Sequence, residues 1–392
     1  MEPPPSSVSP ADMSIASLMQ EAAERAGTDD WGDLDFTDAL ELLLASCREM
    51  DALTALGWRV LRSAARRHLH NRLLTQSFVR AHPDVGKRPL RDAIVVTGLP
   101  RTGTTVLQSL LALDPGNRFL TLWEALRPVP PKDKAARATR IARSHSWLEG
   151  FYEVVPAFRA IHPLTPEGPE ECDALLQNSF ASQHFDDMFD APPYSDWLSH
   201  ADLTPAYAHY ALQLRVLGSS DPKGTAWVLK SPLHVGHLDA LLTALPGALV
   251  VHCHRRPVEA VSSYASLIHR LRRAYSEEVS PPAVGRQALQ RCATAMGRAL
   301  TVRDSGRRET FVDVSHRELA RDPIPVVRDI YERAGRELGE RVEARMRKWV
   351  AENPRERYGE HRYNPADFGL TEADVAAAFA PYTERFADLI RT

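Results

Sequence analysis

The sequence has few of the features that mark secreted, membrane-spanning or nucleic-acid-binding proteins. Only 4 of its 392 residues are cysteine, and none forms a C-x-x-C pair, which disfavours a disulfide framework or a zinc site. No run of about 18 apolar residues occurs, which argues against a membrane-spanning helix. The formal net charge of -3 gives no reason to expect nucleic acid as a partner.

The N-terminus also lacks a targeting signal. The opening "MEPPPSSVSPADMS" has neither the charged start nor the apolar centre of a secretory signal peptide. Its prolines and serines predict a disordered N-terminus over residues 1–12. Together with the isolated cysteines, this predicts a cytoplasmic protein with reduced thiols. A hydrophobic content of 44% and a length of 392 residues are sufficient for a large globular core.

Short apolar runs alternate with amphipathic segments after residue 91. Such runs are typical of strands that are buried on both faces of a parallel sheet, so the alternation predicts an α/β fold. The predicted strands are Ala93–Thr97, Trp227–Leu229, Ala248–His252 and Thr310–Val314. The predicted helices are Thr104–Leu113, His234–Leu245, Val258–Leu271 and Pro323–Ala334.

Two further segments accompany this alternating unit. A helical pattern between about residues 36 and 82 predicts that residues 13–90 form a helical segment packed on the core of the α/β domain, which spans residues 91–392. An insertion at about residues 124–222 is rich in proline and aromatic residues ("LRPVPPK", "DAPPYSDWL"). This composition predicts loops and short helices that cover a site.

The stretch "TGLPRTGTTVLQSLL" follows the first predicted strand and resembles a phosphate-binding loop without its lysine. Gly98 and Gly103 allow a tight turn, and the start of the following helix would direct backbone amides at an anion. Thr104 stands where the ATP-binding lysine would be, whereas Arg101 precedes the second glycine. The loop therefore disfavours ATP and suits a monophosphate-like group or a sulfate ester.

A second strand-to-helix junction, "VVHCHRRPVEAVSSYASL", contains another possible anion site. Arg255 lies at the end of the strand, Pro257 suits the first turn of a helix, and Ser263 follows about two turns later. Taken alone, a surface arginine and a helix serine are more often structural than ligand-binding.

The two motifs together resemble those of sulfotransferases that use 3′-phosphoadenosine-5′-phosphosulfate (PAPS). In that family the loop P-[KR]-[ST]-G-[TS]-[TS] binds the 5′-phosphosulfate and matches Pro100, Arg101, Thr102, Gly103, Thr104 and Thr105. The motif R-x-P-x-[DE]-x-x-x-S binds the 3′-phosphate and matches Arg255, Pro257, Glu259 and Ser263. "TGLPRTGTT", "LTLWEALRPVPP", "WVLKSPLHVGHLDALL" and "HRYNPADFGL" are similar to the bacterial branch of the superfamily.

The resemblance implies a P-loop NTPase-like parallel sheet flanked by helices, PAPS as co-substrate, no metal, and transfer of a sulfuryl group to a hydroxyl. Arg101 and Lys230 are then expected to stabilise the transferring group. The base is expected to be His234, which lies two residues after the family's histidine position, here Pro232, or Glu124, which resembles a glutamate used by some bacterial members. An ordinary structural role would pair Glu124 with Arg101 or Arg127.

Further family positions are less well matched. His316 replaces a tyrosine that lies near the adenine, and Arg362 lies where a C-terminal loop often closes over the nucleotide. The acidic run Glu170, Glu171 and Asp173 is a weaker source of a base, since such runs are usually solvated. The histidines show no H-x-x-x-H spacing, and His237, His252 and His254 are expected to be structural.

Two alternatives stay open at this stage: a P-loop kinase of a small molecule and a non-catalytic nucleotide-binding member of the fold. The acceptor is expected to be a hydroxyl of a small molecule, a sugar or a lipid, and the sequence does not choose between these. A homodimer is possible through the N-terminal helices.

Overall fold

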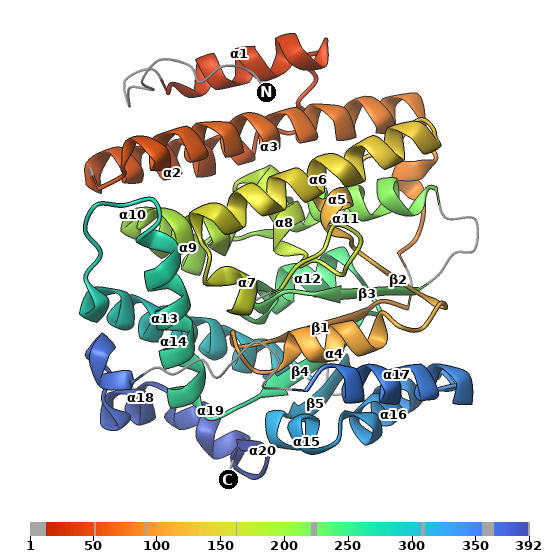
Figure 1. Ribbon diagram of the computed structural model, residues 1–392, viewed down its shortest axis with the longest axis vertical. Helices are drawn as coiled ribbons and strands as arrows, with labels where there is room; N and C mark the ends of the chain where they lie inside the picture. Colours follow the sequence, from red (N-terminus) through yellow and green to blue (C-terminus); the bar gives the residue numbers. More distant parts are fainter. Residues whose placement is uncertain are drawn as a thin grey trace.

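A five-stranded parallel sheet forms the centre of the protein. The computed structural model describes residues 13–50, 52–90, 92–161, 163–220, 226–306, 310–354 and 364–390. Its strands run in the order β2-β3-β1-β4-β5, and every neighbouring pair is parallel. Figure 1 shows helices on both faces of this sheet. The strands are β1 (Ile94–Gly98), β2 (Asn117–Phe119), β3 (Ala226–Lys230), β4 (Leu249–His254) and β5 (Phe311–Ser315).

The four predicted strands are therefore confirmed, and β2 was missed. β2 has three residues, "NRF", and it lies at the edge of the sheet, where an apolar run is not required. Its backbone pairs with β3, so that Asn117 lies opposite Ala226. A strand that is buried on both faces is identified by a continuous apolar run, and such a short edge strand has no such run.

The side chains of β1 alternate between two hydrophobic clusters, one on each face of the sheet. Val95 packs in the larger cluster, whereas Ile94 and Val96 pack in the smaller one. Successive side chains of a strand point to opposite faces, so both faces of β1 need apolar residues. The apolar run that predicted this strand is a direct consequence of its burial on both faces.

The helices that connect the strands agree with the predictions except after β3. The predicted helix His234–Leu245 begins as a 3₁₀ helix, because Ser231 caps a turn that starts at Pro232, and becomes α-helical only at Leu238. The connecting helices are α4 (Thr104–Leu111), η4 (Pro232–His237), α12 (Leu238–Ala244), α13 (Pro257–Arg272), α14 (Pro281–Asp304), α15 (His316–Arg321) and α16 (Pro323–Arg333).

The insertion contains the short helices that the sequence predicts, but the prediction missed its long helices. Two of its helices are long, namely α6 (Lys134–Val154) and α11 (Thr204–Gly218). Its prolines do not interrupt helices, because Pro192 and Pro205 lie in the first turn of α10 and α11, where proline is tolerated. The other elements are α5 (Leu122–Ala125), α7 (Phe158–Ile161), α8 (Asp173–Leu176), η3 (Gln177–Ser179), α9 (Gln183–Phe189) and α10 (Pro192–His200).

The N-terminal helices pack on this insertion, at the end of the molecule opposite α15 and α16 (Figure 1). Leu40 of α2 and Leu61 of α3 belong to the same hydrophobic cluster as Leu175 of the insertion and Val95 of the sheet. The elements are α1 (Ile15–Ala26), α2 (Phe36–Met50), α3 (Ala55–Ala81) and η2 (Val85–Lys87). The predicted disordered segment, residues 1–12, lies outside the described residues.

The C-terminal helices close the other end of the sheet. Phe386 and Leu389 in this region contribute to the cluster that also covers Phe311 of β5. The elements are α17 (Glu340–Glu352), η7 (Pro365–Phe368), α18 (Glu372–Ala378), α19 (Ala380–Arg385) and α20 (Ala387–Ile390). Over the ranges that the structure describes, no helix combines the length and apolar character that crossing a membrane would require.

Candidate functional site

The functional candidates converge because the strands are parallel. The carboxyl ends of β1, β3, β4 and β5 lie at the same edge of the sheet, where ligands of α/β proteins usually bind. β1 leads into the glycine loop, β3 ends at Lys230, β4 is followed by Arg255, and β5 is followed by His316. The order of the strands thus brings together residues that lie far apart in the sequence.

The loop after β1 is held in a tight turn. Three of its residues have positive φ angles: 148° at Gly98, 70° at Arg101 and 90° at Gly103. The Thr102 hydroxyl donates to the Leu99 carbonyl at 2.8 Å, which closes the turn from inside. A non-glycine residue rarely adopts a φ of 70°, so Arg101 occupies a strained position that the surrounding loop maintains.

Gly98 is required by the close approach of β1 to β4, and we expect Gly98→Ala to destabilise the fold. A Cβ atom there would lie 2.4 Å from the Cys253 carbonyl oxygen and 2.9 Å from Thr102 Oγ1. We expect a loss of roughly 2–4 kcal/mol in the free energy of unfolding, measured by urea denaturation. As control, Gly297→Ala in α14 meets open space and should gain up to about 1 kcal/mol. Equal midpoints for the two variants would contradict this account.

The two anion motifs are in direct contact. Arg255 Nη1 donates to the backbone carbonyl of Arg101 at 2.8 Å, and Arg255 Nε donates to Glu259 at 2.8 Å. Its guanidinium therefore lies against the first loop. His316 also borders this loop, since a Cβ added at Gly103 would lie 3.3 Å from its ring.

The two remaining candidates of the nucleotide site lie further along the chain. Ser263 is buried within α13, two turns beyond Arg255. Arg362 lies outside the described residues.

Lys230 and Glu171 form an ion pair directly beside the loop. The Lys230 ammonium is buried, contacts the Glu171 carboxylate, and lies 3.4 Å from the hydroxyl of Thr105 at the start of α4. The Glu171 side chain retains 25% of its exposure, so it is only partly covered by the fold. This arrangement places a cation, a carboxylate and the glycine loop within one small volume.

The segment that carries Glu171 is anchored on both sides. Glu170 donates its backbone N–H to Leu120, and its carbonyl accepts from the Gln108 amide of α4 at 3.0 Å. Cys172 donates its backbone N–H to the Lys230 carbonyl at 2.8 Å. Glu171 is thus fixed between the first helix after the loop and the end of β3.

The expectation that this acidic run is a solvated face was wrong. Glu170 and Asp173 are buried, each with 9% exposure. Burial raises the pKa of Asp173 to about 7, although the Ser182 hydroxyl donates to its carboxylate at 2.6 Å. The sequence gave no sign of the ion pair between Lys230 and Glu171, because the two residues lie 59 positions apart.

His234 occupies an enclosed position behind the site. Its side chain is fully buried, its Nδ1 lies 2.8 Å from the Tyr207 hydroxyl, and its Nε2 is buried without a hydrogen-bond partner within the described chain. Burial lowers its pKa to about 3. Such a histidine is a weak proton acceptor at neutral pH, which opposes the predicted role as catalytic base.

The buried histidines make the protein sensitive to acid. Burial lowers the pKa of His234 and of His237 to about 3, below the ordinary value of 6.5. Since the unfolded chain then binds more protons, stability decreases as the pH falls below 6.5, by about 1.4 kcal/mol per pH unit for each histidine. We expect the free energy of unfolding at pH 5.5 to be at least about 2 kcal/mol lower than at pH 7.5. Asp173 and Asp187, whose pKa values burial raises to about 7, act in the opposite direction, but the further buried histidines with lowered pKa values outweigh them, namely His68, His184, His209 and His252.

Urea denaturation at several pH values measures this effect. His237→Gln should lower the number of protons taken up on unfolding by about one, and the slope of the unfolding free energy against pH falls in proportion. Equal stabilities at pH 5.5 and pH 7.5 would show that these two imidazoles accept protons in the folded state.

Glu124 caps a helix and pairs with an arginine. It accepts from the backbone N–H and the hydroxyl of Thr121 at 3.1 and 2.7 Å, as a capping box does. Its ion-pair partner is Arg118 at 2.7 Å, and neither Arg101 nor Arg127, which the sequence suggested. Within the part of the chain that the structure describes, these contacts account for its carboxylate and give it a structural role.

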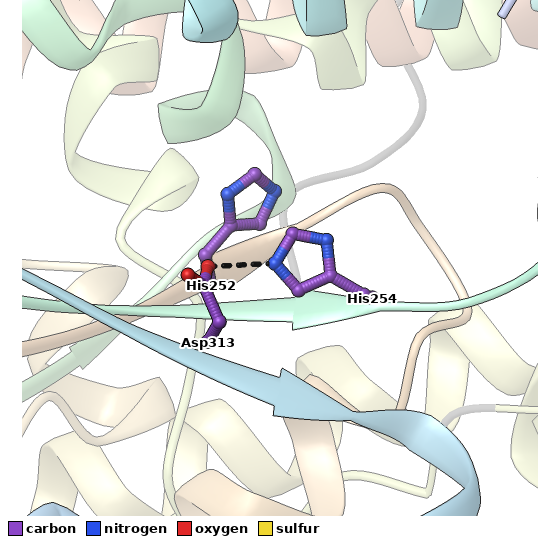
Figure 2. A group of neighbouring side chains, drawn as sticks. All are labelled: His252, His254 and Asp313. Atoms are coloured by element: carbon purple, nitrogen blue, oxygen red, sulfur yellow. Dashed lines mark hydrogen bonds and ion pairs between the residues drawn. The ribbon is translucent and has the colours of Figure 1, made fainter. Parts of the chain in front are cut away.

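A cluster of titratable side chains lies on the neighbouring strands β4 and β5, shortly before Arg255. Figure 2 shows that His252, His254 and Asp313 project toward one another, and His254 Nε2 lies 2.8 Å from Asp313 Oδ1. Arg303 donates to the other carboxylate oxygen of Asp313 at 2.7 Å. Burial alone would raise the pKa of Asp313, but the bonds from His254 and Arg303 outweigh it and lower this pKa.

This cluster has the residue types of a metal site, but its geometry favours a hydrogen-bond network. Two imidazoles that bind one zinc ion at about 2.1 Å with tetrahedral angles have ring centres roughly 5 Å apart. The rings of His252 and His254 have centres only 4.2 Å apart. The Arg303 guanidinium also lies 3.4 Å from His252 Nδ1 and bonds to Asp313, so a cation already neutralises the carboxylate.

The fold and the loop at the strand ends define a P-loop-like α/β protein. The model of the sulfotransferase family matches residues 93–340, so the chain belongs to the sulfotransferase family. Comparison with curated proteins gives no match.

Two solved structures are similar over nearly the whole chain. The sulfotransferase STF9 from Mycobacterium avium is 29% identical, with a TM-score of 0.86, over 95% of this chain and 96% of that protein. The sulfotransferase STF1 from Mycobacterium tuberculosis is 30% identical, with a TM-score of 0.80, over 94% of this chain and 99% of that protein.

Proposed function

We propose that this sulfotransferase moves a sulfuryl group from PAPS to a hydroxyl of a small-molecule, sugar or lipid acceptor. The observation that supports this best is the Lys230–Glu171 pair beside Thr105 of the glycine loop. A cation and an accessible carboxylate beside an anion-binding loop are what this reaction needs from the protein. The alternatives of a kinase and a non-catalytic member lack a comparable observation.

The residues at the strand ends fit the charges of the donor nucleotide. The glycine loop and the start of α4 supply backbone amides and the Thr105 hydroxyl for the phosphosulfate. Arg255 lies against the same loop, where its guanidinium would bind the 3′-phosphate, with Ser263 and His316 beside the nucleotide. At Gly98 and Gly103 the backbone approaches its neighbours so closely that a Cβ atom at either position would clash.

We propose that Glu171 accepts the proton of the acceptor hydroxyl. The acceptor oxygen forms a bond to sulfur as the bond from sulfur to the phosphate oxygen breaks, and the donor leaves as 3′,5′-bisphosphoadenosine. Lys230 and Arg101 stabilise the negative charge on the transferring oxygens and on the departing phosphate. Arginine has a pKa above about 12, so Arg101 acts through charge and hydrogen bonds without giving up a proton.

The proposal requires no metal, because Lys230, Arg101 and Arg255 supply the positive charge. The His252, His254 and Asp313 cluster then serves to hold Arg303 and the end of β4.

We further propose that residues 13–90 form a helical cover on the catalytic unit, residues 91–392. Four buried free cysteines agree with our proposal that the enzyme works in the reducing cytoplasm.

Two measurements test this function. Calorimetry should show micromolar binding of 3′,5′-bisphosphoadenosine, and mass spectrometry should show acceptors in a cell extract that gain one SO₃ unit when PAPS and the protein are added. If the nucleotide does not bind, the proposed donor is wrong. Binding without any sulfated product would favour a non-catalytic member of the family.

A further inference from the structure

The carbonyl of Arg255 lies between two regular elements. β4 ends one residue before Arg255, and α13 begins two residues after it. The first carbonyl that accepts bonds from α13 is that of Arg256, which takes the N–H groups of Glu259 and Ala260. The peptide of Arg255 therefore depends on a contact from another part of the chain to hold its direction.

Tyr382 of α19 provides this contact. Its buried hydroxyl lies 3.5 Å from the Arg255 carbonyl oxygen and 3.1 Å from Nδ1 of His254. Its ring stacks on the imidazole of His254, with centres 5.7 Å apart and planes 22° apart. One side chain thus contacts both residues at the junction after β4, although it lies 127 positions from Arg255 in the sequence.

Asp313 determines which way the proton of Tyr382 points. Burial acts to raise the pKa of Asp313, but the bonds from His254 and Arg303 outweigh this and lower it, so the ionised carboxylate can only accept. His254 therefore donates its Nε2–H to Asp313 at 2.8 Å, along the dashed line in Figure 2. Burial lowers the pKa of His254, so the imidazole is neutral and its Nδ1 is an acceptor. The hydroxyl proton of Tyr382 then lies between this nitrogen and the Arg255 carbonyl.

Helix α19 is anchored to the same sheet. At the end of β5, the Ser315 hydroxyl donates to the Leu389 carbonyl of α20 at 2.9 Å. Phe386, between α19 and α20, packs on the imidazole of His254, with ring centres 4.2 Å apart. Tyr382 and Phe386 are both buried, so close packing fixes their places. The contact with Arg255 therefore comes from a rigid part of the fold.

We propose that Tyr382 positions Arg255 for the 3′-phosphate of the nucleotide, so that α19 contributes to the preference for a 3′-phosphorylated donor. This inference rests on the proposed function. Tyr382 holds the backbone of Arg255. The guanidinium is held separately, by Glu259 and by the Arg101 carbonyl, at 2.8 Å each. Bonds from a guanidinium to a phosphate depend on direction, so a rotation of this backbone weakens the contact with the 3′-phosphate and spares the rest of the nucleotide.

Calorimetry with two nucleotides tests this proposal. 3′,5′-Bisphosphoadenosine carries the 3′-phosphate and adenosine 5′-phosphate lacks it, so the ratio of their dissociation constants measures recognition of this group alone. The preference should be about 100-fold or more for the wild type and should fall about 30-fold or more in Arg255→Ala. Tyr382→Phe keeps the ring but removes the hydroxyl, and it should lower the preference roughly threefold to tenfold. Added to Arg255→Ala, it should have no further effect.

Tyr331→Phe is the matched control, since it also removes a buried hydroxyl. The hydroxyl of Tyr331, on α16, donates to Asp114 at 2.6 Å, so its loss should lower stability but leave the preference unchanged. Urea denaturation shows that each variant is folded.

Three results would overturn the proposal and leave the sulfotransferase function intact. They are an unchanged preference in Tyr382→Phe, an equal loss in Tyr331→Phe, and a further loss when Tyr382→Phe is added to Arg255→Ala. A wild type that binds both nucleotides equally, or binds neither, would contradict the proposed donor site itself.

Discussion

Glu171→Gln is expected to lower kcat by roughly 100- to 10,000-fold while leaving binding of 3′,5′-bisphosphoadenosine nearly unchanged. The amide keeps the shape of the side chain and can still accept a hydrogen bond from Lys230, but it cannot take up the proton of the acceptor. Single-turnover measurements of sulfuryl transfer, with calorimetry of the nucleotide, separate loss of chemistry from loss of binding. A merely structural glutamate would show no such separation.

Three matched variants sharpen this test. Glu167→Gln changes an exposed glutamate of the same segment, which pairs with Arg137, and should keep full activity. Glu124→Gln should reduce stability, by up to about 2 kcal/mol, because it weakens the helix cap at Thr121. His234→Gln should lower kcat much less than Glu171→Gln. A loss in His234→Gln as large as in Glu171→Gln would return the role of base to the histidine.

Arg255→Ala is expected to weaken binding of 3′,5′-bisphosphoadenosine by roughly 2–4 kcal/mol, or about 30- to 1,000-fold. The guanidinium is mostly buried, with 22% exposure, and a charge pairing is worth more where water is excluded. The substitution also removes the hydrogen bond to the Arg101 carbonyl, so the first loop loses a support. Calorimetry at several salt concentrations measures the affinity for the nucleotide, and the change in affinity with salt gives the electrostatic contribution to the binding free energy.

The neighbouring arginine gives the control for this variant. Arg256 is 45% exposed and points its charge toward Glu259 at 3.6 Å. Arg256→Ala should change the affinity only slightly. Equal losses for Arg255→Ala and Arg256→Ala would show that general positive charge, and no specific contact, attracts the nucleotide.

The sheet was predictable because each central strand is buried on both faces. Burial on both faces demands a continuous apolar run, and such runs are visible without any knowledge of the partners. β2 was missed because an edge strand of three residues needs no such run. The long helices of the insertion were missed because Pro192 and Pro205 look like helix breakers until their position in the first turn is known.

The site was only partly predictable. The loop from Pro100 to Thr105 and the motif at Arg255 are local, so their residue types and spacing identify them, and their contact at Arg101 follows from neighbouring parallel strands. The partner of Lys230 could not be identified in this way. Among the four acidic candidates, namely Glu124, Glu170, Glu171 and Asp173, the choice depends on burial and on contacts across the fold.

The sequence by itself thus determined the parallel α/β sheet and the two loops proposed to bind the nucleotide, because both depend on local patterns of apolar residues, glycine and arginine. Only the tertiary structure decided between the acidic and basic candidates. Glu124 pairs with Arg118 and His234 contacts Tyr207, whereas Glu171 lies against Lys230. The reason is physical: the use of an ionisable side chain depends on the charges and the solvent around it, and these come from segments far away in the chain.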